Sequence, residues 1–297
     1  MHAFQGFLSD ETIIHAANES CCDVSVIITF HREGLLAKRM LDGFVAVRDH
    51  AEKHGISVQL VCVLDTPDCD TQKIVCNNNI ILDNDWILVT EKGDPGNSRN
   101  VGISFANGTY ICVVDGDDYY SVNWITEAYH LADQYGASVV VHPEYVVSFG
   151  AQHALTRLVD QRLDSFPLAA CASSNPWVST AFAHATIFRS TPYLSTYAKI
   201  SGFGFEDWHW NLEVIAKGVL HILASNTALY YRRKKDSILI TDKSQRAVIR
   251  PSIFFEFPEF WENGFPLADD LRTLSKVVPQ YHTVAGSSSN SVNGSLP

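Results

Sequence analysis

The sequence has no long apolar run and no surplus of basic residues, and each absence excludes a class of protein. No apolar stretch approaches the roughly 20 residues that a membrane-spanning helix needs. Lys and Arg total 22 against 33 Asp and Glu, a formal net charge of −11, which argues against nonspecific nucleic-acid binding as the main activity. An anionic ligand remains compatible with this charge if a metal ion or a local basic cluster meets it.

The chain also lacks paired cysteine motifs and an N-terminal targeting pattern. Its seven cysteines are scattered, odd in number and never spaced as the CxxC of a zinc or redox site. The opening residues, MHAFQGFLSDETIIH, contain no basic region followed by an apolar run, so we predict no signal peptide. These absences favour the reducing cytoplasm, with the protein either soluble there or held peripherally at the inner face of the membrane.

Strand-like and helical segments alternate along the first half of the chain. Apolar, β-branched runs typical of strands buried on both faces occupy residues 24–30, 57–64, 86–90 and 110–114. Helical spacing or turn residues separate these runs and predict helices over 35–54, 70–82 and 98–106. Such alternation predicts an α/β fold, a doubly wound and mostly parallel sheet with helices on both faces.

The second half of the chain has a looser pattern, and residues 148–180 are rich in small polar side chains. We expect a helix over 123–135, strands over 138–147, 181–189 and 219–231, and a helix from 208 to about 217. Residues 251–283 are expected to form a C-terminal helical extension. Residues 284–297 are rich in Ser, Asn and Gly and are expected to form a flexible tail, because they cannot bury enough apolar surface.

Three carboxylates follow the strand predicted over 110–114, at Asp115, Asp117 and Asp118. Like charges this close repel one another, so they cost stability unless a cation or hydrogen-bond donors offset the repulsion. Polar residues also follow the first two predicted strands, and ligands of open parallel sheets bind beyond these carboxyl ends. The alternative interpretation is an Asp-rich turn that caps the helix predicted at 123, a role that suits Asp118.

Four motifs occur in a fixed order along the chain. They are TFHRE (29–33), GNSRNVG (96–102), VDGDD (114–118) and GFEDW (204–208). Together, over about residues 24–237, they resemble family 2 of the inverting glycosyltransferases, which have the GT-A fold. The resemblance implies a GT-A domain over residues 1–250, with a Rossmann-like nucleotide-sugar half at about 20–120 and an acceptor half at about 121–250.

The resemblance also implies an activity. Members of this family move a sugar from a nucleotide-diphosphate sugar, here expected to be a UDP-sugar, to a hydroxyl of a glycan or lipid-linked glycan acceptor. A bound Mn²⁺ or Mg²⁺ stabilises the charge of the diphosphate leaving group, and carboxylates supply the oxygen ligands that such cations take. The implied role is surface polysaccharide synthesis, with association with a membrane surface or with other enzymes left open.

The resemblance assigns roles to particular residues. The expected catalytic base is Asp207, with Glu206 beside it, and the expected metal ligands are Asp117 and Asp115. The nucleotide pocket is expected to be lined by Thr29, Phe30, Arg32, Glu33, Asp65, Gly96, Arg99, Asp115 and Lys234, with Asp65 taking a base N–H. Candidates for contact with the acceptor are Trp177, Trp208 and His184.

Several assignments have a structural alternative that the sequence leaves open. Core packing competes for Phe30, Trp177 and His184, and a surface ion pair on a short helix competes for Arg99. Glu206 and Asp207 also suit the N-terminus of a helix by their charge.

The sequence departs from the family pattern at Lys234, where many relatives carry a histidine that reaches the metal. A protonated lysine has no lone pair for a cation, so fewer protein ligands are expected. A degenerate module that binds nucleotide or glycan without turnover therefore stays an alternative. A sugar nucleotidyltransferase is a further one, although that class opens with a Gly-rich loop and a lysine rather than His31-Arg-Glu.

Overall fold

The computed structural model describes residues 11–17, 21–163, 165–166, 168–233 and 247–256 of the chain. The chain divides into two units, residues 1–265 and 266–297, and every described residue belongs to the first. Lys234, the predicted tail and most of the predicted helical extension lie outside the described residues. Of that extension, the structure describes residues up to 256, which include the short 3-10 helix η3 (Ile253–Glu256).

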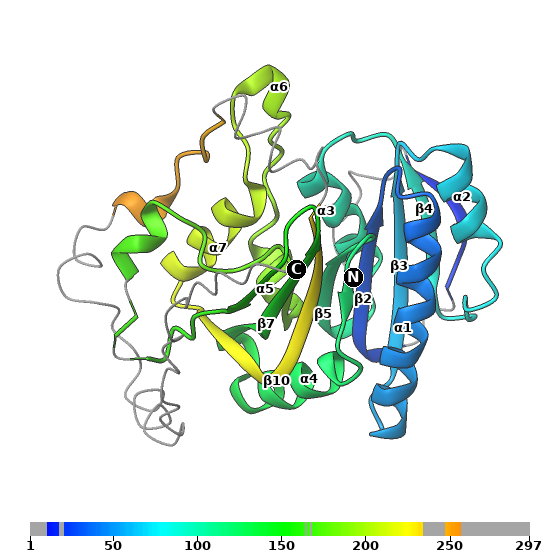
Figure 1. Cartoon of the computed structure of the whole chain (residues 1–297), viewed down its shortest axis with the longest axis horizontal. Helices are drawn as coiled ribbons and strands as arrows, with labels where there is room; N and C mark the ends of the chain where they lie inside the picture. The colour runs from blue at the N-terminus through cyan, green and yellow to red at the C-terminus, as the bar shows by residue number, and fades with distance from the viewer. Residues whose placement is uncertain (1–10, 18–20, 164, 167, 234–246, 257–297) are drawn as a thin grey trace, which may run out of the picture. The chain divides into compact units, whose positions relative to one another are not determined.

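One sheet runs through the described part of the first unit, in the order β1-β4-β3-β2-β5-β9-β7-β10-β6, with β8 paired to β7 (Figure 1). The strands are β1 (Thr12–His15), β2 (Cys22–Phe30), β3 (Val58–Asp65), β4 (Trp86–Thr90), β5 (Gly108–Asp115), β6 (Tyr119–Tyr120), β7 (Val139–Gly150), β8 (Ala154–Arg157), β9 (Ala181–His184) and β10 (Leu220–Arg233). The pairs β3–β4, β2–β3, β2–β5 and β7–β10 are parallel. The short strand β9 is antiparallel to both of its neighbours, β5 and β7, and joins the two halves.

Helices cover both faces of this sheet. They are α1 (Leu35–Lys53), α2 (Cys69–Cys76), α3 (Pro95–Phe105), α4 (Trp124–Tyr135), α5 (Ala185–Ser190), α6 (Ala198–Ser201) and α7 (Glu206–Ala216), with 3-10 turns η1 (Gly136–Ser138) and η2 (Leu168–Ala172). Ile27 and Val63 face a core shared with α3, α5 and α7, whereas Val26 and Val114 face α1 and α4. This alternation follows from the two-residue period of a strand. The predicted α/β fold with a doubly wound sheet is therefore confirmed.

Three predicted boundaries differ from the structure for local reasons. The strand expected over 181–189 ends at His184, whose ring accepts a hydrogen bond from the backbone N–H of Thr186 and so caps α5. Helix α2 ends at Cys76, before a run of asparagines, which favour turns over helix. Helix α3 begins earlier than expected, at Pro95, because the Asp94 side chain accepts from Asn97 N and proline suits the first helical position.

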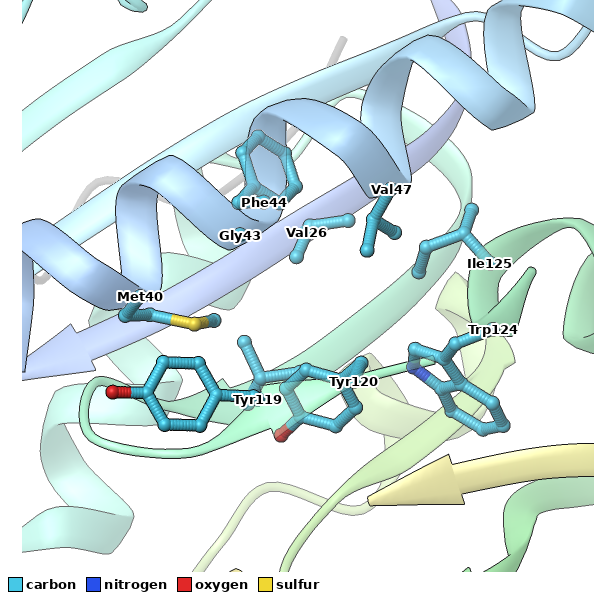
Figure 2. A pocket seen from close by; sticks show the side chains of 10 residues that line it. Val26, Met40, Gly43, Phe44, Val47, Tyr119, Tyr120, Trp124 and Ile125 are labelled. Carbon is cyan, nitrogen blue, oxygen red and sulfur yellow. The ribbon is translucent and has the colours of Figure 1, made fainter. Parts of the chain in front are cut away.

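A small apolar cavity of about 30 Å³ lies between α1, β6 and α4 (Figure 2). Met40, Phe44, Tyr119 and Trp124 contribute to its wall, and Gly43 lies on the helix that borders it. A Cβ atom built on Gly43 would meet only Tyr119 Cδ1 at 3.8 Å, an ordinary van der Waals contact.

We expect Gly43→Ala to stabilise the protein by about 1 kcal/mol, because glycine is unfavourable inside a helix and no neighbour must move. Urea unfolding followed by circular dichroism measures the change. The matched control is Gly102→Ala in α3, where the new Cβ would lie 2.3 Å from Ile27 Cγ2 and should destabilise. If the two substitutions changed the free energy of unfolding equally, the difference in space around Gly43 and Gly102 would not determine their stability effects.

Among the described helices, none combines the length and the apolar character needed to cross a membrane.

Candidate active site

The carboxyl ends of the parallel strands bring the sequence motifs to one edge of the sheet. Thr29 of β2 pairs with Asp115 of β5, and Phe30 pairs with Leu64, the residue before Asp65 on β3. The N-terminal parts of α3 and α7 reach the same edge, because Arg99 contacts both Asp115 and Glu206. Motif residues that lie as far apart in the sequence as Thr29 and Glu206 thus meet at this edge, where ligands of such sheets bind.

Arg99 is a buried bridge between two carboxylates. Its side chain is 3% exposed, one terminal nitrogen lies 2.6 Å from Glu206 Oε1, and the other lies 3.0 Å from Asp115 Oδ1. Burial alone lowers the pKa of Arg99, but the charges of Asp115 and Glu206 outweigh it and hold the pKa well above its ordinary value. Arg99 therefore forms a buried ion pair rather than a surface one, and its predicted contact with a nucleotide stays a prediction.

Asp207 lies in the first turn of α7, beside Glu206. Phe205, which precedes them, has a left-handed backbone with φ of 58°, and this turn starts the helix at the two acids. Asp207 is partly buried, and its Oδ2 accepts a hydrogen bond from Asn175 Nδ2 at 3.1 Å. Burial, and then the charge of Glu206, raise the pKa of Asp207 to about 7, while Arg99 opposes the shift. A carboxyl group with this pKa can exchange a proton near neutral pH.

Hydrogen-bond donors offset part of the repulsion among the three carboxylates after β5. Asp115 accepts from Arg99 through Oδ1 and from Ser179 Oγ through Oδ2 at 2.8 Å. Asp118 is buried and accepts from the backbone N–H of Arg232, at the end of β10, at 3.0 Å. The N-cap of α4 is Asn123, so Asp118 does not cap that helix but ties the turn to β10. Asp117 is partly exposed.

Asp115 and Asp117 are the two carboxylates of this turn that are not fully buried. No group of three or more His, Cys, Asp or Glu side chains within the described ranges could hold a metal ion alone. Mg²⁺ commonly takes only one or two protein carboxylates, with phosphate oxygens and water completing its shell. The donor set therefore fits a cation that binds together with a diphosphate rather than before it.

Asp65 holds a loop instead of presenting a bare carboxylate. Its side chain accepts from the backbone N–H groups of Gly93 and Asp94 and, at 2.7 Å, from Ser98 Oγ. It is 6% exposed, so Asp65 holds the loop before α3 in this structure, and its predicted contact with a base N–H stays a prediction.

Gly96 allows that loop to approach the chain near α6. A Cβ on Gly96 would lie 2.9 Å from the carbonyl oxygen of Leu194, too close for any side chain. The neighbouring Asp94 accepts from Thr196 N at 2.7 Å and fixes the same contact. The structure thus gives Gly96 a packing role, and its predicted nucleotide contact stays a prediction.

The remaining predicted nucleotide residues divide by burial. The side chain of Phe30 is 1% exposed, and its ring lies so close to Gly116 that a Cβ there would be 2.4 Å from Phe30 Cδ1, so core packing is the correct interpretation. Arg32 is exposed, and Thr29 and Glu33 are partly buried at the strand end. Arg32 is the most exposed of the three, and the Glu33 carboxylate accepts a hydrogen bond from the backbone N–H of His31.

The three acceptor candidates do not form one group. Trp177 is 5% exposed and its ring stacks on His221 at 4.1 Å, so it packs in the core. Trp208 is partly buried and donates through Nε1 to the carbonyl of Cys171. His184 pairs with Tyr110, at the opposite end of β5 from Asp115, so the structure places it away from the site.

Sequence reasoning missed Asn175 and Ser179, which contact Asp207 and Asp115. Both lie in the stretch of small polar residues before β9, which has no apolar period. The available signal was the polar run Ser173-Ser-Asn-Pro-Trp177, an unusual composition next to a buried tryptophan.

Comparison with known proteins identifies what this geometry resembles. Residues 25–168 match the family model described as Glycosyl transferase family 2. A curated relative, Glycosyltransferase GlyG of Streptococcus pneumoniae serotype 4, is 30% identical over 124 residues, which make up 41% of this chain and 39% of the relative. The chain thus matches well under half the length of this relative.

Solved structures share the fold at low sequence identity. S. aureus TarS 1-349 in complex with UDP-GlcNAc superposes with a TM-score of 0.56 at 17% identity, covering 79% of this chain and 64% of that one. GalNAc-T7 with UDP, GalNAc and Mn²⁺ superposes with a TM-score of 0.53 at 13% identity, covering 74% and 44%. The expected resemblance to family 2 and the expected GT-A fold are both confirmed.

Proposed function

We propose that this chain, which carries a family 2 glycosyltransferase region on a GT-A fold, transfers a sugar with inversion from a nucleotide-diphosphate sugar to an acceptor hydroxyl. The observation that carries the proposal is one cluster at the sheet edge. In it Arg99 joins Asp115, after β5, to Glu206, the neighbour of the partly buried Asp207. A pKa of about 7 suits Asp207 to act as a base near neutral pH.

In this mechanism Asp207 accepts the proton of the acceptor hydroxyl as that oxygen attacks the anomeric carbon. The new C–O bond forms on one face of the sugar while the bond to the diphosphate breaks on the other, so the configuration inverts. Glu206 shares the buried Arg99 with Asp115, which keeps the base-bearing turn of α7 next to the donor side.

We assign Asp115 and Asp117 as the residues that would hold Mn²⁺ or Mg²⁺. When bound, this cation would supply stabilisation of the negative charge on the departing diphosphate. Thr29, Arg32 and Glu33 are the proposed side chains of the nucleotide pocket. UDP is the preferred nucleotide of the proposal, since both TarS and GalNAc-T7 are described with UDP compounds.

The acceptor in the proposal is a hydroxyl of a glycan or lipid-linked glycan, in surface polysaccharide synthesis. This part follows from the family resemblance, and the match to GlyG, a protein named as a glycosyltransferase, supports the transfer step alone. Work at a membrane surface or beside partner enzymes belongs to the same proposal.

The experiment that tests the proposal is calorimetric titration with UDP, dTDP, GDP and CDP, each with Mn²⁺ and with EDTA. We expect one nucleotide to bind only with Mn²⁺, because Asp115 and Asp117 would repel the diphosphate unless a cation offsets their charge. Asp117→Ala should weaken this binding by tenfold or more, an order-of-magnitude value for losing a charged metal ligand.

The matched control is Asp42→Ala, which removes an exposed carboxylate on α1 that pairs with Lys38. This variant should bind the nucleotide as the wild type does. No binding of any nucleotide by a folded wild type would refute the proposal. Metal-dependent binding without transfer to any glycan would instead favour a binding module.

A further inference from the structure

Asn175 is the side chain outside the sequence motifs that contacts the proposed base. It lies between η2 and β9, and its Nδ2 donates to Asp207 Oδ2 at 3.1 Å. Its Oδ1 accepts from Asn211 Nδ2, on α7, at 2.9 Å and from the backbone N–H of Trp177 at 3.3 Å. One amide group therefore makes three hydrogen bonds, two of which fix the amide itself.

The orientation of this amide follows from its partners. A backbone N–H can only donate, so the atom that faces Trp177 N must be the carbonyl oxygen of Asn175. The NH₂ group then has to point at Asp207, where a carboxylate oxygen accepts it. A flipped amide would place a carbonyl against the carboxylate and an NH₂ against the backbone N–H, losing both interactions.

The segment that follows Asn175 is anchored by burial and hydrogen bonds. Trp177 is buried, its Nε1 donates to the carbonyl of Val159 at 2.8 Å, and its ring stacks on His221. Further along the same segment, the hydroxyl of Thr180 pairs with Tyr120 at 2.8 Å. Ser179, one residue earlier, holds Asp115. The segment 175–180 thus contacts both the proposed base and the proposed metal carboxylate.

Several other groups act on Asp207. Burial, Glu206 on the same helix and Asp115 at the end of β5 disfavour the carboxylate, whereas Arg99 on α3 and a hydrogen bond from the backbone of Trp208 favour it. Tyr193, which precedes α6, also interacts electrostatically with Asp207. Asn175 adds a neutral side-chain hydrogen bond to Asp207, and donation to a carboxylate favours its charged form.

We propose that Asn175 is a positioning residue for the Asp207 carboxylate, holding Oδ2 and stabilising the ionised form that a base needs. The inference rests on the proposed function for its catalytic meaning, but the contact can be tested without turnover. The substitution Asn175→Asp is nearly isosteric. It keeps the oxygen that accepts from Asn211 and Trp177, and it replaces only the donor that faces Asp207.

The test is a ¹³C NMR titration of protein labelled at the aspartate carboxyl carbon, with Asp207 assigned by its loss in Asp207→Asn. In Asn175→Asp the two carboxyl groups share a proton and titrate as a pair, so the upper midpoint should rise by about one to two pH units. Asn175→Ala, which adds no charge, should raise the Asp207 midpoint in the same direction. Ser179→Ala removes a different hydrogen bond of the same segment and should leave the Asp207 midpoint where it is in the wild type.

Transfer assays add a second readout. If the inference holds, the acid limb of the kcat/KM profile of Asn175→Ala moves to higher pH with the NMR midpoint, so activity falls most at low pH. An unmoved Asp207 midpoint in both Asn175 variants, with native near-ultraviolet circular dichroism, overturns the inference. A raised midpoint in a protein that transfers no sugar supports the inference about Asn175 and refutes the proposed function alone.

Discussion

Asp207→Asn should lower kcat/KM for sugar transfer by about 10²–10⁴-fold and, at the same time, stabilise the folded protein above neutral pH. The loss of activity follows because an amide cannot accept the proton of the acceptor hydroxyl. The gain in stability follows because the wild-type carboxylate is held in a place that disfavours its charge. If Asp207 had a purely structural role, its substitution would lower both kcat/KM and the stability of the folded protein.

The sign of the stability change comes from the pKa of Asp207, which is about 7 in the folded chain against an ordinary value of 3.8. The folded state therefore keeps its proton to higher pH than the unfolded state does. Wild-type stability falls as the pH rises from about 4 to about 7, and the loss is complete above that range. Asparagine does not titrate, so its advantage grows over the same window to about 4 kcal/mol, at 1.36 kcal/mol per pKa unit.

Urea unfolding of wild type and Asp207→Asn at pH 5 and pH 8.5 measures this difference. The control is Asp42→Asn, whose carboxylate is exposed on α1, and it should show no such pH dependence. An Asp207→Asn protein that is less stable than the wild type at pH 8.5 would contradict the inference that the fold disfavours the charged form of Asp207.

Arg99→Met is expected to destabilise the protein by about 3–5 kcal/mol, because it leaves Asp115 and Glu206 without their shared buried cation. Methionine keeps much of the side-chain volume, so the loss reports charge more than packing. The matched control is Lys38→Met, which breaks an ion pair whose side chains are 58% and 54% exposed and should cost less than about 1 kcal/mol.

Denaturant unfolding of the two variants at pH 7.5 makes the comparison. The double variant Arg99→Met, Glu206→Gln should recover part of the loss, since one of the stranded charges is gone. If Arg99→Met lowers the free energy of unfolding no more than Lys38→Met does, the ion pairs of Arg99 with Asp115 and Glu206 do not stabilise the protein as predicted.

The sequence was sufficient for the features that depend on local periodicity and on motif order. Buried β-branched runs located β2, β3 and β5, and the acid motifs located Asp115 and Asp207, because both patterns are written in consecutive residues. The hydrogen-bond and ion-pair partners of Asp65 and Arg99 could not be predicted in this way. Their partners lie far along the chain, at Gly93 to Ser98 and at Glu206, so only the folded chain could show that both side chains are already engaged.

Asn175 was not predicted for a related reason, because a single polar residue in a segment without a period carries no pattern. The strand that begins at residue 181 was predicted, but its antiparallel position between β5 and β7 was not. That position depends on contacts with two strands that lie far away in the sequence.

The placement of β9 has a consequence for the order in which the chain becomes folded. Strands β5 and β7 precede β9 in the sequence, yet in the sheet they are separated by it. While the chain emerges from the ribosome, β5 and β7 must each keep a bare edge until residues 181–184 arrive, and bare edges invite pairing with other chains. The stretch that matches the family model ends at residue 168, before β9, so it stops short of the strand that closes the centre of the sheet.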